Sequence, residues 1–302
     1  MKKFIPLFFM FLFIIPFLVG CRGTVVTTIV AEGELISRDV AISGNINAID
    51  ILGVFDVTVS IGDVSSVSMY VQDNIWEITQ TSFANSTFST RLQRGLFISF
   101  SQAERPRIHI TTPSLTSATL GGVTIVNLGE ITRDSFILNT SGNSKVEMSF
   151  YGRTLNVYAS NTSKIDLSGE AQHLIVSTAG NAELNAENFT ASNNLTITAS
   201  NTSAIATNFV GQNATIHASG NSHINLSGTA QFVSVTASNT ANLQALYLIA
   251  QEYIINGSNA TRFYVHATDS IGGTLSNSSR VTYCGSPVVN VVTSGTASIV
   301  AR

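Results

Sequence analysis

The sequence predicts an all-β protein, a single-stranded right-handed parallel β-helix (β-solenoid) of about 19 residues per coil. Three observations lead to this prediction. A small polar cluster such as ASNTS, TSGNS or ASGNS recurs nine times from Ser141 to Ser294, at steps of 18 to 21 residues. Apolar residues keep fixed positions on both sides of each cluster. They alternate with polar residues at the period of two that is typical of strands, and helical spacing is absent.

The apolar columns define the repeating unit. Five residues after the start of each cluster all nine positions are apolar, from Val146 to Ile299. Five and three residues before the later clusters, Gly273 is the single exception. Each unit therefore reads as strand, arc, strand and tight turn. Nineteen residues at about 3.3 Å each suit one closed coil, and successive coils would stack in parallel about 4.8 Å apart. We expect right-handed winding because parallel crossovers almost always have that hand.

The polar cluster is predicted to be the corner of each coil. One position in it requires a residue that tolerates positive φ, which glycine does best and asparagine next. These structural turn positions are Gly142, Asn161, Gly180, Asn201, Gly220, Asn239, Asn277 and Gly295. The flanking Ser and Ala are small, as crowding between stacked coils demands, and the amides and hydroxyls are able to form ladders along the axis.

The N-terminus predicts export and lipid attachment. Two lysines precede an apolar run that ends in LVGC, the pattern of a secretory signal whose last motif resembles the bacterial lipobox. We expect residues 1–20 to be a lipoprotein signal peptide, Cys21 to carry the lipid (palmitate among its acyl chains), and residues 21–33 to form a tether. With Cys21 lipidated, Cys284 has no partner for an intrachain disulfide. The expected location is the bacterial cell envelope, with a lipid anchor at the outer membrane, because a residue other than Asp after the cysteine, here Arg22, resembles the pattern of Gram-negative lipoproteins at that membrane.

Residues 34–302 are expected to form the β-helix domain, with an irregular start or cap at 34–119 and regular repeats at 120–302. The first part contains the strand-like runs DVAISG, AIDILG, FDVTVSIGD, SVSMYVQ, LFISFS and IHITTPS, and a short helix is expected near DNIWEITQ. LGGVTIVNL, at 120–128, looks like a degenerate earlier coil. A separate N-terminal β-domain is the alternative.

At this point the chain resembles a known family. FDVTVSIGD, DNIWEI, HITTPSLTSATLGG, the Ser/Gly-centred repeats and CGSPVVNVVTSGTASI follow the running order of the head-GIN-domain family of auto-transporter adhesins, over about residues 34–302. The resemblance implies a β-helix related to pectin-lyase-like solenoids and adhesion at the cell surface. The family's turns usually read Gly-Ser-Gly followed by Asp. Here Asn and Thr largely replace them, so properties tied to acidic turns do not carry over.

Composition and motifs argue against nucleic-acid binding, catalysis and metal binding. Apolar residues make up 44% of the chain, charged residues only 11%, and the net charge is −3. No basic run occurs beyond the N-terminus, so nucleic acid is not an expected partner.

Glu147 and Asp166 occupy one outward position on adjacent coils, at a spacing that would suit a retaining glycosidase. Lys145 and Lys164 beside them favour a solvated charge ladder instead. His217 and His223 flank one turn, but two histidines make an incomplete metal site. We expect no catalytic residues, no metal and no cofactor.

The outward faces between corners are the expected place for binding. The proposed contact face comprises Tyr158, Ile175, Thr196, Thr198, Thr215 and His217. The favoured function is a non-catalytic binding or adhesion module at the bacterial surface, which contacts the membrane through its lipid and a glycan or surface protein through this face. A carbohydrate-active β-helix enzyme (polysaccharide lyase or hydrolase) is the alternative, and a structural envelope protein without external ligand is a second one. An exposed strand edge at the last coil also makes a homo-oligomer a possible state.

Overall fold

The computed structural model describes residues 27–100 and 103–302. The expected signal peptide and the lipid-attachment residue Cys21 lie outside these residues. Among the described residues, no helix has the length and apolar character needed to cross a membrane.

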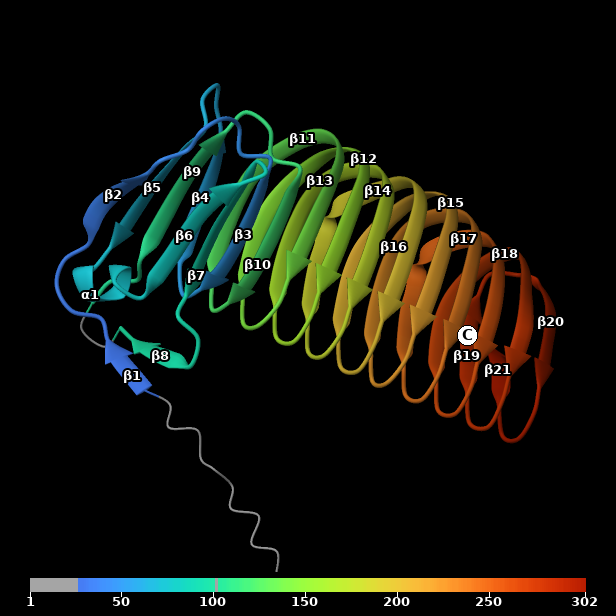
Figure 1. Cartoon of the computed structure of the whole chain (residues 1–302). Coiled ribbons are helices and arrows are strands. Elements are labelled where there is room, and N and C mark those ends of the chain that lie inside the picture. The colour runs from blue at the N-terminus through green and yellow to red at the C-terminus, as the bar shows by residue number, and fades with distance from the viewer. Residues whose placement is uncertain (1–26, 101–102) are drawn as a thin grey trace, which may run out of the picture.

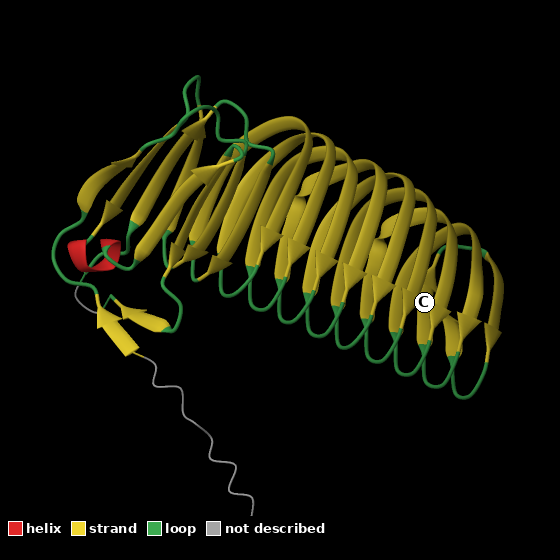
Figure 2. Ribbon diagram, in the orientation of Figure 1, coloured by secondary structure: helices red, strands yellow, loops and turns green. Residues whose placement is uncertain are grey.

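The described chain is all-β with one short helix, as Figure 2 shows. The elements are β1 (Thr27–Val30), β2 (Ile36–Val40), β3 (Ala48–Gly53), β4 (Asp56–Ile61), β5 (Ser66–Val71), α1 (Asp73–Trp76), β6 (Thr79–Ala84), β7 (Thr87–Leu92), β8 (Leu96–Ser99), β9 (Arg107–Thr112), β10 (Ser117–Gly122), β11 (Ile125–Thr140), β12 (Lys145–Ala159), β13 (Lys164–Thr178), β14 (Glu183–Ala199), β15 (Ala204–Ala218), β16 (His223–Ala237), β17 (Asn242–Gly257), β18 (Arg262–Leu275), β19 (Arg280–Cys284), β20 (Val288–Thr293) and β21 (Ser298–Ala301).

The chain winds into a β-solenoid of about 10 coils with about 19 residues each, which confirms the predicted fold class. From β11 to β18 each long strand follows almost the whole circuit of one coil, and it pairs in parallel with the next strand in sequence. Val146 lies beside Ile165, and Val157 lies beside Val176. Nothing in these pairings gives the hand of the winding, so right-handedness stays a prediction.

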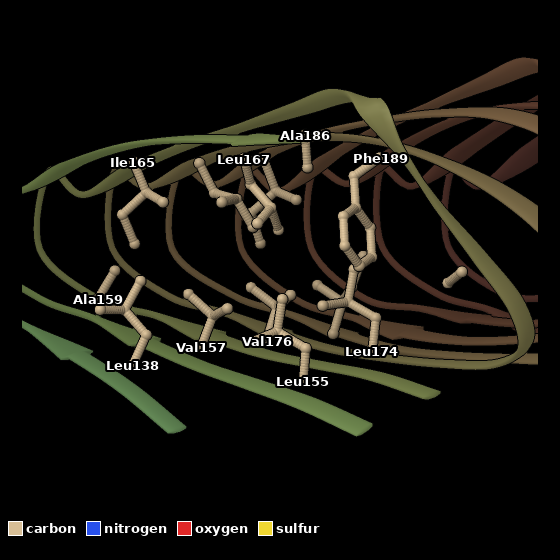
Figure 3. Packing of buried hydrophobic residues seen from close by; sticks show 14 of the residues in the cluster. Leu138, Leu155, Val157, Ala159, Ile165, Leu167, Leu174, Val176, Ala186 and Phe189 are labelled. Atoms are coloured by element: carbon tan, nitrogen blue, oxygen red, sulfur yellow. The ribbon is translucent and has the colours of Figure 1, made fainter. Parts of the chain in front are cut away.

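The predicted apolar columns form the core. One cluster of buried residues runs through the solenoid from Ile46 to Val281. Figure 3 shows Leu155, Val157 and Val176 on one wall of the coil facing Ile165 and Leu167 on the other. Phe189 extends into the space between the walls and is fully buried. Since burial of each large apolar side chain contributes about 1.5–3 kcal/mol, this continuous interior is the main stabilising element of the stack.

The first part of the chain extends the stack and then closes its end. β3 pairs in parallel with β10 and β4 with β11, while β7 and β9 continue the same stack beyond β3 and β4. β5, β6 and β2 then add in antiparallel fashion. This pairing removes the parallel edge that an open solenoid would expose at this end. Whether 34–119 should be called a cap or a domain is not decided by these contacts.

Three details of this region differ from the sequence prediction. Thr27–Val30, inside the segment expected to be a tether, forms β1 and pairs with β8. The alternation of TTIV explains this, because Ile29 packs against a second small core formed by Ala31, Val71, Ile75 and Ile98. The β6–β7 hairpin was not predicted, although Asn85 and Ser86 form its two-residue turn with φ of 50° and 57°. β2 ends at Val40, earlier than the run DVAISG implies.

Candidate functional site

The corners are built for stacking. The structural turn positions all have φ between 59° and 71°, and Asn259, which the sequence analysis left out of the series, has φ of 63°. A Cβ on Gly142 would lie 2.5 Å from the carbonyl oxygen of Gly122, so no larger residue fits there. At the later corners the side-chain amide of Asn259 donates to Asn239 Oδ1 at 3.2 Å, and that of Asn277 donates to Asn259 Oδ1 at 3.1 Å. The amides therefore hold neighbouring coils together, so they are not free for a ligand.

The six residues of the predicted contact face do lie on one outward sheet surface. Strand register places Ile175, Thr196 and Thr215 in one row along the axis. A second row contains Tyr158, Thr198 and His217, with Ser177 between the first two. The tyrosine is 43% exposed and the isoleucine 36%. The face is a shallow surface of hydroxyl and apolar groups, hollowed to about 470 Å³ around Thr196 and Thr215.

The charged row lies on the other side of the corners and comprises Lys145, Glu147, Lys164, Asp166 and Glu183. It contains one ion pair between coils among the described residues. Glu147 and Asp166 are neighbours in the strand register, as predicted. The ion pair in this row joins Lys164 Nζ to Glu183 Oε2 at 2.7 Å, with both side chains more than half exposed. Its hydrogen bond raises the pKa of the Lys164 ammonium. The lysine thus pairs with its register neighbour on the following coil, whereas the predicted ladder paired Lys145 and Lys164 with Glu147 and Asp166. The Asn185 amide donates to Asp166 Oδ1 at 3.3 Å.

The histidines are separated by the coil geometry. His217 ends the sheet before its corner and His223 begins the sheet after it. His173 Nδ1 lies 3.1 Å from the amide nitrogen of Asn194. Within residues 27–100 and 103–302, no three His, Cys, Asp or Glu side chains are grouped so that they could hold a metal ion. Cys284 is free and half-buried.

A feature that sequence reasoning missed is a groove beside the charged row. Three coils carry a β-bulge at the same place, where two residues stand opposite one in the neighbouring strand. Two residues stand opposite one at Leu128–Gly129 in β11, Ala186–Glu187 in β14 and Ala245–Leu246 in β17. Toward the following coil, residues 187–189 of β14 and 246–248 of β17 have no register partner, and the name bulge covers these residues too. The two coils between successive bulges, β12 and β13 and then β15 and β16, pair without any shift. Because a bulge bends its strand locally, every third coil protrudes from the outer surface at this position.

The groove consists of hollows between these bulges. Hollow A, of about 490 Å³, lies between the bulges of β11 and β14 and is lined by Glu130, Glu147, Asp166, Ser149 and Asn188, among others. Hollow B, of about 540 Å³, lies between the bulges of β14 and β17. Its lining comprises Glu187, Ala206, Thr207, Asn225, Leu226, Ser227, Gln244, Leu246 and Tyr247. A third hollow of about 450 Å³ shares Asp166 with hollow A and Glu187 with hollow B, which makes the groove continuous.

The spacing of the repeats contained a signal for the groove. Cluster steps of 19 residues are interrupted by steps of 21 and 20, at the coils that carry the bulges of β14 and β17. The extra residue of β17 lies at the bulge beside the groove, whereas β14 has a second insertion at Ser192–Asn193, opposite Gln172. The strand ends next to the corners stay in register, so the corners remain stacked. Among the described residues, the groove contains both the predicted carboxylates and an exposed tyrosine that the sequence analysis did not single out.

Comparisons with known proteins agree with this architecture. Residues 45–208 and 190–287 match the family model described as "Putative auto-transporter adhesin, head GIN domain". A search of curated proteins found no match.

Several solved structures resemble the chain at low sequence identity. Putative adhesins from Parabacteroides merdae and Parabacteroides distasonis are each 16% identical and align over 91% of this chain and 99% and 100% of theirs, with TM-scores of 0.50. A protein from Parabacteroides distasonis described as a putative lipid binding protein is also 16% identical over 91% of this chain and 100% of its own, with a TM-score of 0.49. At this identity the likeness to the two adhesins concerns the fold alone.

Proposed function

Since the chain belongs to the putative auto-transporter adhesin family with a head GIN domain, we propose that it is a non-catalytic binding module, held in the bacterial cell envelope by a lipid on Cys21. The observation that carries the proposal is the unbroken parallel stack from β11 to β18. Such a stack presents outward side chains in rows about 4.8 Å apart, which suits contact with an extended partner.

The anchor and the fold fit together in this proposal. Five residues lie between Cys21 and Thr27, the start of β1, and the six residue steps span at most about 20 Å. The antiparallel end of the solenoid would therefore lie close to the membrane. The contact face begins at Tyr158 in β12 and the groove at Asn127 in β11. The coils that follow lead away from the antiparallel end, as Figure 1 shows, so a surface partner has access to them.

The charged row supports binding more than catalysis. A general acid requires an environment that keeps a carboxyl protonated, usually burial in an apolar pocket. Glu147 is exposed and Asp166 is half-exposed with an amide donor on its carboxylate. Two carboxylates on an open surface are suited to hydrogen bonding with a ligand.

Two measurements test the proposal. Mature protein on beads is presented to a glycan array, to extracellular-matrix proteins and to host cells, and each polysaccharide on the array is assayed for products. We expect saturable binding without turnover. Turnover that is lost in Glu147→Gln would contradict the proposal in favour of an enzyme, and absence of any binding would favour a structural envelope protein. For the anchor, Cys21→Ser should abolish palmitate labelling and membrane partition, and unchanged partition would refute lipid attachment.

A further inference from the structure

We propose that hollow B is a binding site for a neutral oligosaccharide and that the ring of Tyr247 is its stacking platform. This inference rests on the proposed binding function and adds to it the place and the class of ligand. It uses a surface on the opposite side of the corners from the predicted contact face. The argument depends on four features of the hollow: its aromatic wall, its polar floor, its charge and its length.

The aromatic wall has no structural role of its own. Tyr247 is 84% exposed, the highest value among the large apolar and aromatic side chains of the described residues. It stands beside Ser227 of the preceding coil, on the bulge of β17, while the next residue, Leu248, is buried and holds the bulge to the core. In the bulge of β14 the equivalent position, beside Ser168, is Asn188. The fold therefore does not require an aromatic residue here. An exposed ring above a hollow offers its face to the C–H groups of a sugar ring.

The floor supplies hydrogen-bonding groups that match hydroxyls. Asn225 and Gln244 follow one another in the outward row, and Ser227 lies beside them. Amide and hydroxyl side chains both donate and accept hydrogen bonds, as sugar hydroxyls do. Asn225 is exposed, and its amide has no hydrogen-bond partner within the part of the chain that the structure describes. At the same row on the preceding coil, Ala206 is small enough to leave room above the floor.

Charge selects a neutral ligand. Among the described residues, Glu187 is the one carboxylate that lines hollow B, and no Lys, Arg or His lines it. Further along the groove, Glu130, Glu147 and Asp166 line hollow A, while Lys145, Lys164 and His223 line the third hollow, where Lys164 is paired with Glu183. In hollow B itself, a uronic acid, sulfated sugar or phosphate would face Glu187 without a cation to balance its charge. A neutral sugar meets no such opposition, and Glu187 is able to accept hydrogen bonds from its hydroxyls.

The length of the hollow favours an oligosaccharide. Three coil spacings separate the bulge of β14 from the bulge of β17, which gives a floor about 14 Å long. This exceeds a single sugar ring and suits a short linear chain lying along the solenoid axis. Because the groove continues into hollow A, a longer chain is able to extend past Glu187 without leaving the surface.

The experiment measures binding of defined neutral hexasaccharides to the mature protein. The probes are maltohexaose, cellohexaose, mannohexaose, xylohexaose and chitohexaose (fully N-acetylated), with hexagalacturonate as the anionic counterpart, and binding is followed by calorimetry and ligand-observed NMR. We expect at least one neutral probe to bind and hexagalacturonate to bind at least tenfold more weakly. Tyr247→Ala should weaken the neutral probe at least tenfold, and Tyr247→Phe should retain most of the affinity.

Controls separate this site from the contact face. Tyr158→Ala removes a partly exposed tyrosine from that face and should leave the affinity unchanged. Ala206→Trp fills the floor of hollow B and should abolish binding, while thermal unfolding confirms that both variants fold. If Tyr247→Ala and Ala206→Trp leave the binding of a neutral sugar unchanged while Tyr158→Ala abolishes it, the sugar does not bind in hollow B. That result would refute the proposed site but not the proposed binding function. Failure of every hexasaccharide to bind would overturn the ligand class, while binding to matrix proteins or host cells separately decides the proposed function.

Discussion

Two adjacent glycines in β18 offer a sharp test of how the coils stack. Gly273 is the one exception in the inward apolar columns, and it has φ of 120°. A Cβ placed on it would lie 2.2 Å from the carbonyl oxygen of Ile255 and 2.8 Å from that residue's carbonyl carbon and nitrogen. Gly272 has no positive φ, and its Cβ would meet Cδ1 of Ile254 at 3.1 Å and the carbonyl oxygen of Asn290 at an ordinary 3.9 Å. The substitutions Gly273→Ala and Gly272→Ala are chemically identical and one residue apart.

The expected magnitudes differ by several kcal/mol. Holding an alanine at φ near 120° costs about 1–3 kcal/mol. Relieving an overlap with backbone atoms, which cannot rotate away, costs about another 1–3 kcal/mol. We therefore expect Gly273→Ala to destabilise its coil by about 4 kcal/mol, against about 5–15 kcal/mol for a typical domain. Gly272→Ala only displaces the end of a flexible side chain, and the alanine restricts the unfolded chain, so its effect should stay within about 1 kcal/mol.

Amide hydrogen exchange is the suitable assay, because coils of a repeat protein are able to open locally. A loss of about 4 kcal/mol corresponds to a decrease of about a thousandfold in protection, since each 1.4 kcal/mol is a factor of ten. We expect this decrease in peptides covering β18 and β20 of Gly273→Ala, with β12–β14 little changed. Equal protection in the two variants, or an unchanged Gly273→Ala, would refute the inference that backbone contact at this position determines the stacking.

Further predictions concern the core and the response to pH. Replacing Phe189, which is fully buried beneath the bulge of β14, by alanine should lower the free energy of unfolding by about 3–5 kcal/mol. The control Phe97→Ala, at a side chain 61% exposed, should change thermal stability little, and equal losses would show that Phe189 does not support the bulge. Burial raises the pKa of the Tyr253 phenol well above its usual 10.0, with a smaller opposing effect from the backbone of His266, and the hydroxyl donates to Leu248 O at 3.0 Å. Because the unfolded phenol ionises near pH 10 and the folded one does not, its contribution is fully present below pH 10 and is lost as pH rises above it. Tyr253→Phe should therefore have a free energy of unfolding about 1 kcal/mol lower than that of the parent at pH 8. Between pH 8 and about pH 11 the variant should lose less stability than the parent, because it has no phenol to ionise. Parallel curves of stability against pH for the two proteins would contradict this.

The repeat was readable from the sequence because each coil repeats the same local rules. Positive φ at Asn161 and Gly142 is a property of residue type, and the inward columns follow from alternation. The N-terminal end was less readable because its pairings are antiparallel and distant. Thr27–Val30 forms a strand only because β8, almost 70 residues later, supplies its partner. The TTIV alternation is too short to indicate this by itself.

The candidate site was only partly readable for a related reason. Strand alternation correctly placed Glu147 beside Asp166 and the six contact-face residues on one surface. It assumes, however, that every coil has the same length. The insertions that create hollow B shift the register on one side of two coils, so that Tyr247 projects from a bulge where the repeat pattern assigns it no fixed position. The Lys164–Glu183 pair follows from the same register, because the two residues are direct neighbours on adjacent coils, but comparing Glu147 with Asp166 alone missed it.

The bulges are also the place where this fold is able to change ligands without changing its stack. Corners and inward columns are constrained by contacts with both neighbouring coils, as Gly142 and Gly273 show. In a bulge the buried residue, Phe189 in β14 or Leu248 in β17, maintains the connection to the core. The residue before it faces outward and is free to vary, being Asn188 in one bulge and Tyr247 in the other. Hollows A and B thus share a backbone and differ in chemistry, because hollow A is rich in carboxylates and hollow B has one carboxylate and an aromatic wall. Transplanting the tyrosine by Asn188→Tyr should therefore add affinity for the neutral hexasaccharide to a Tyr247→Ala protein. If it adds none, the difference between the hollows resides in their floors.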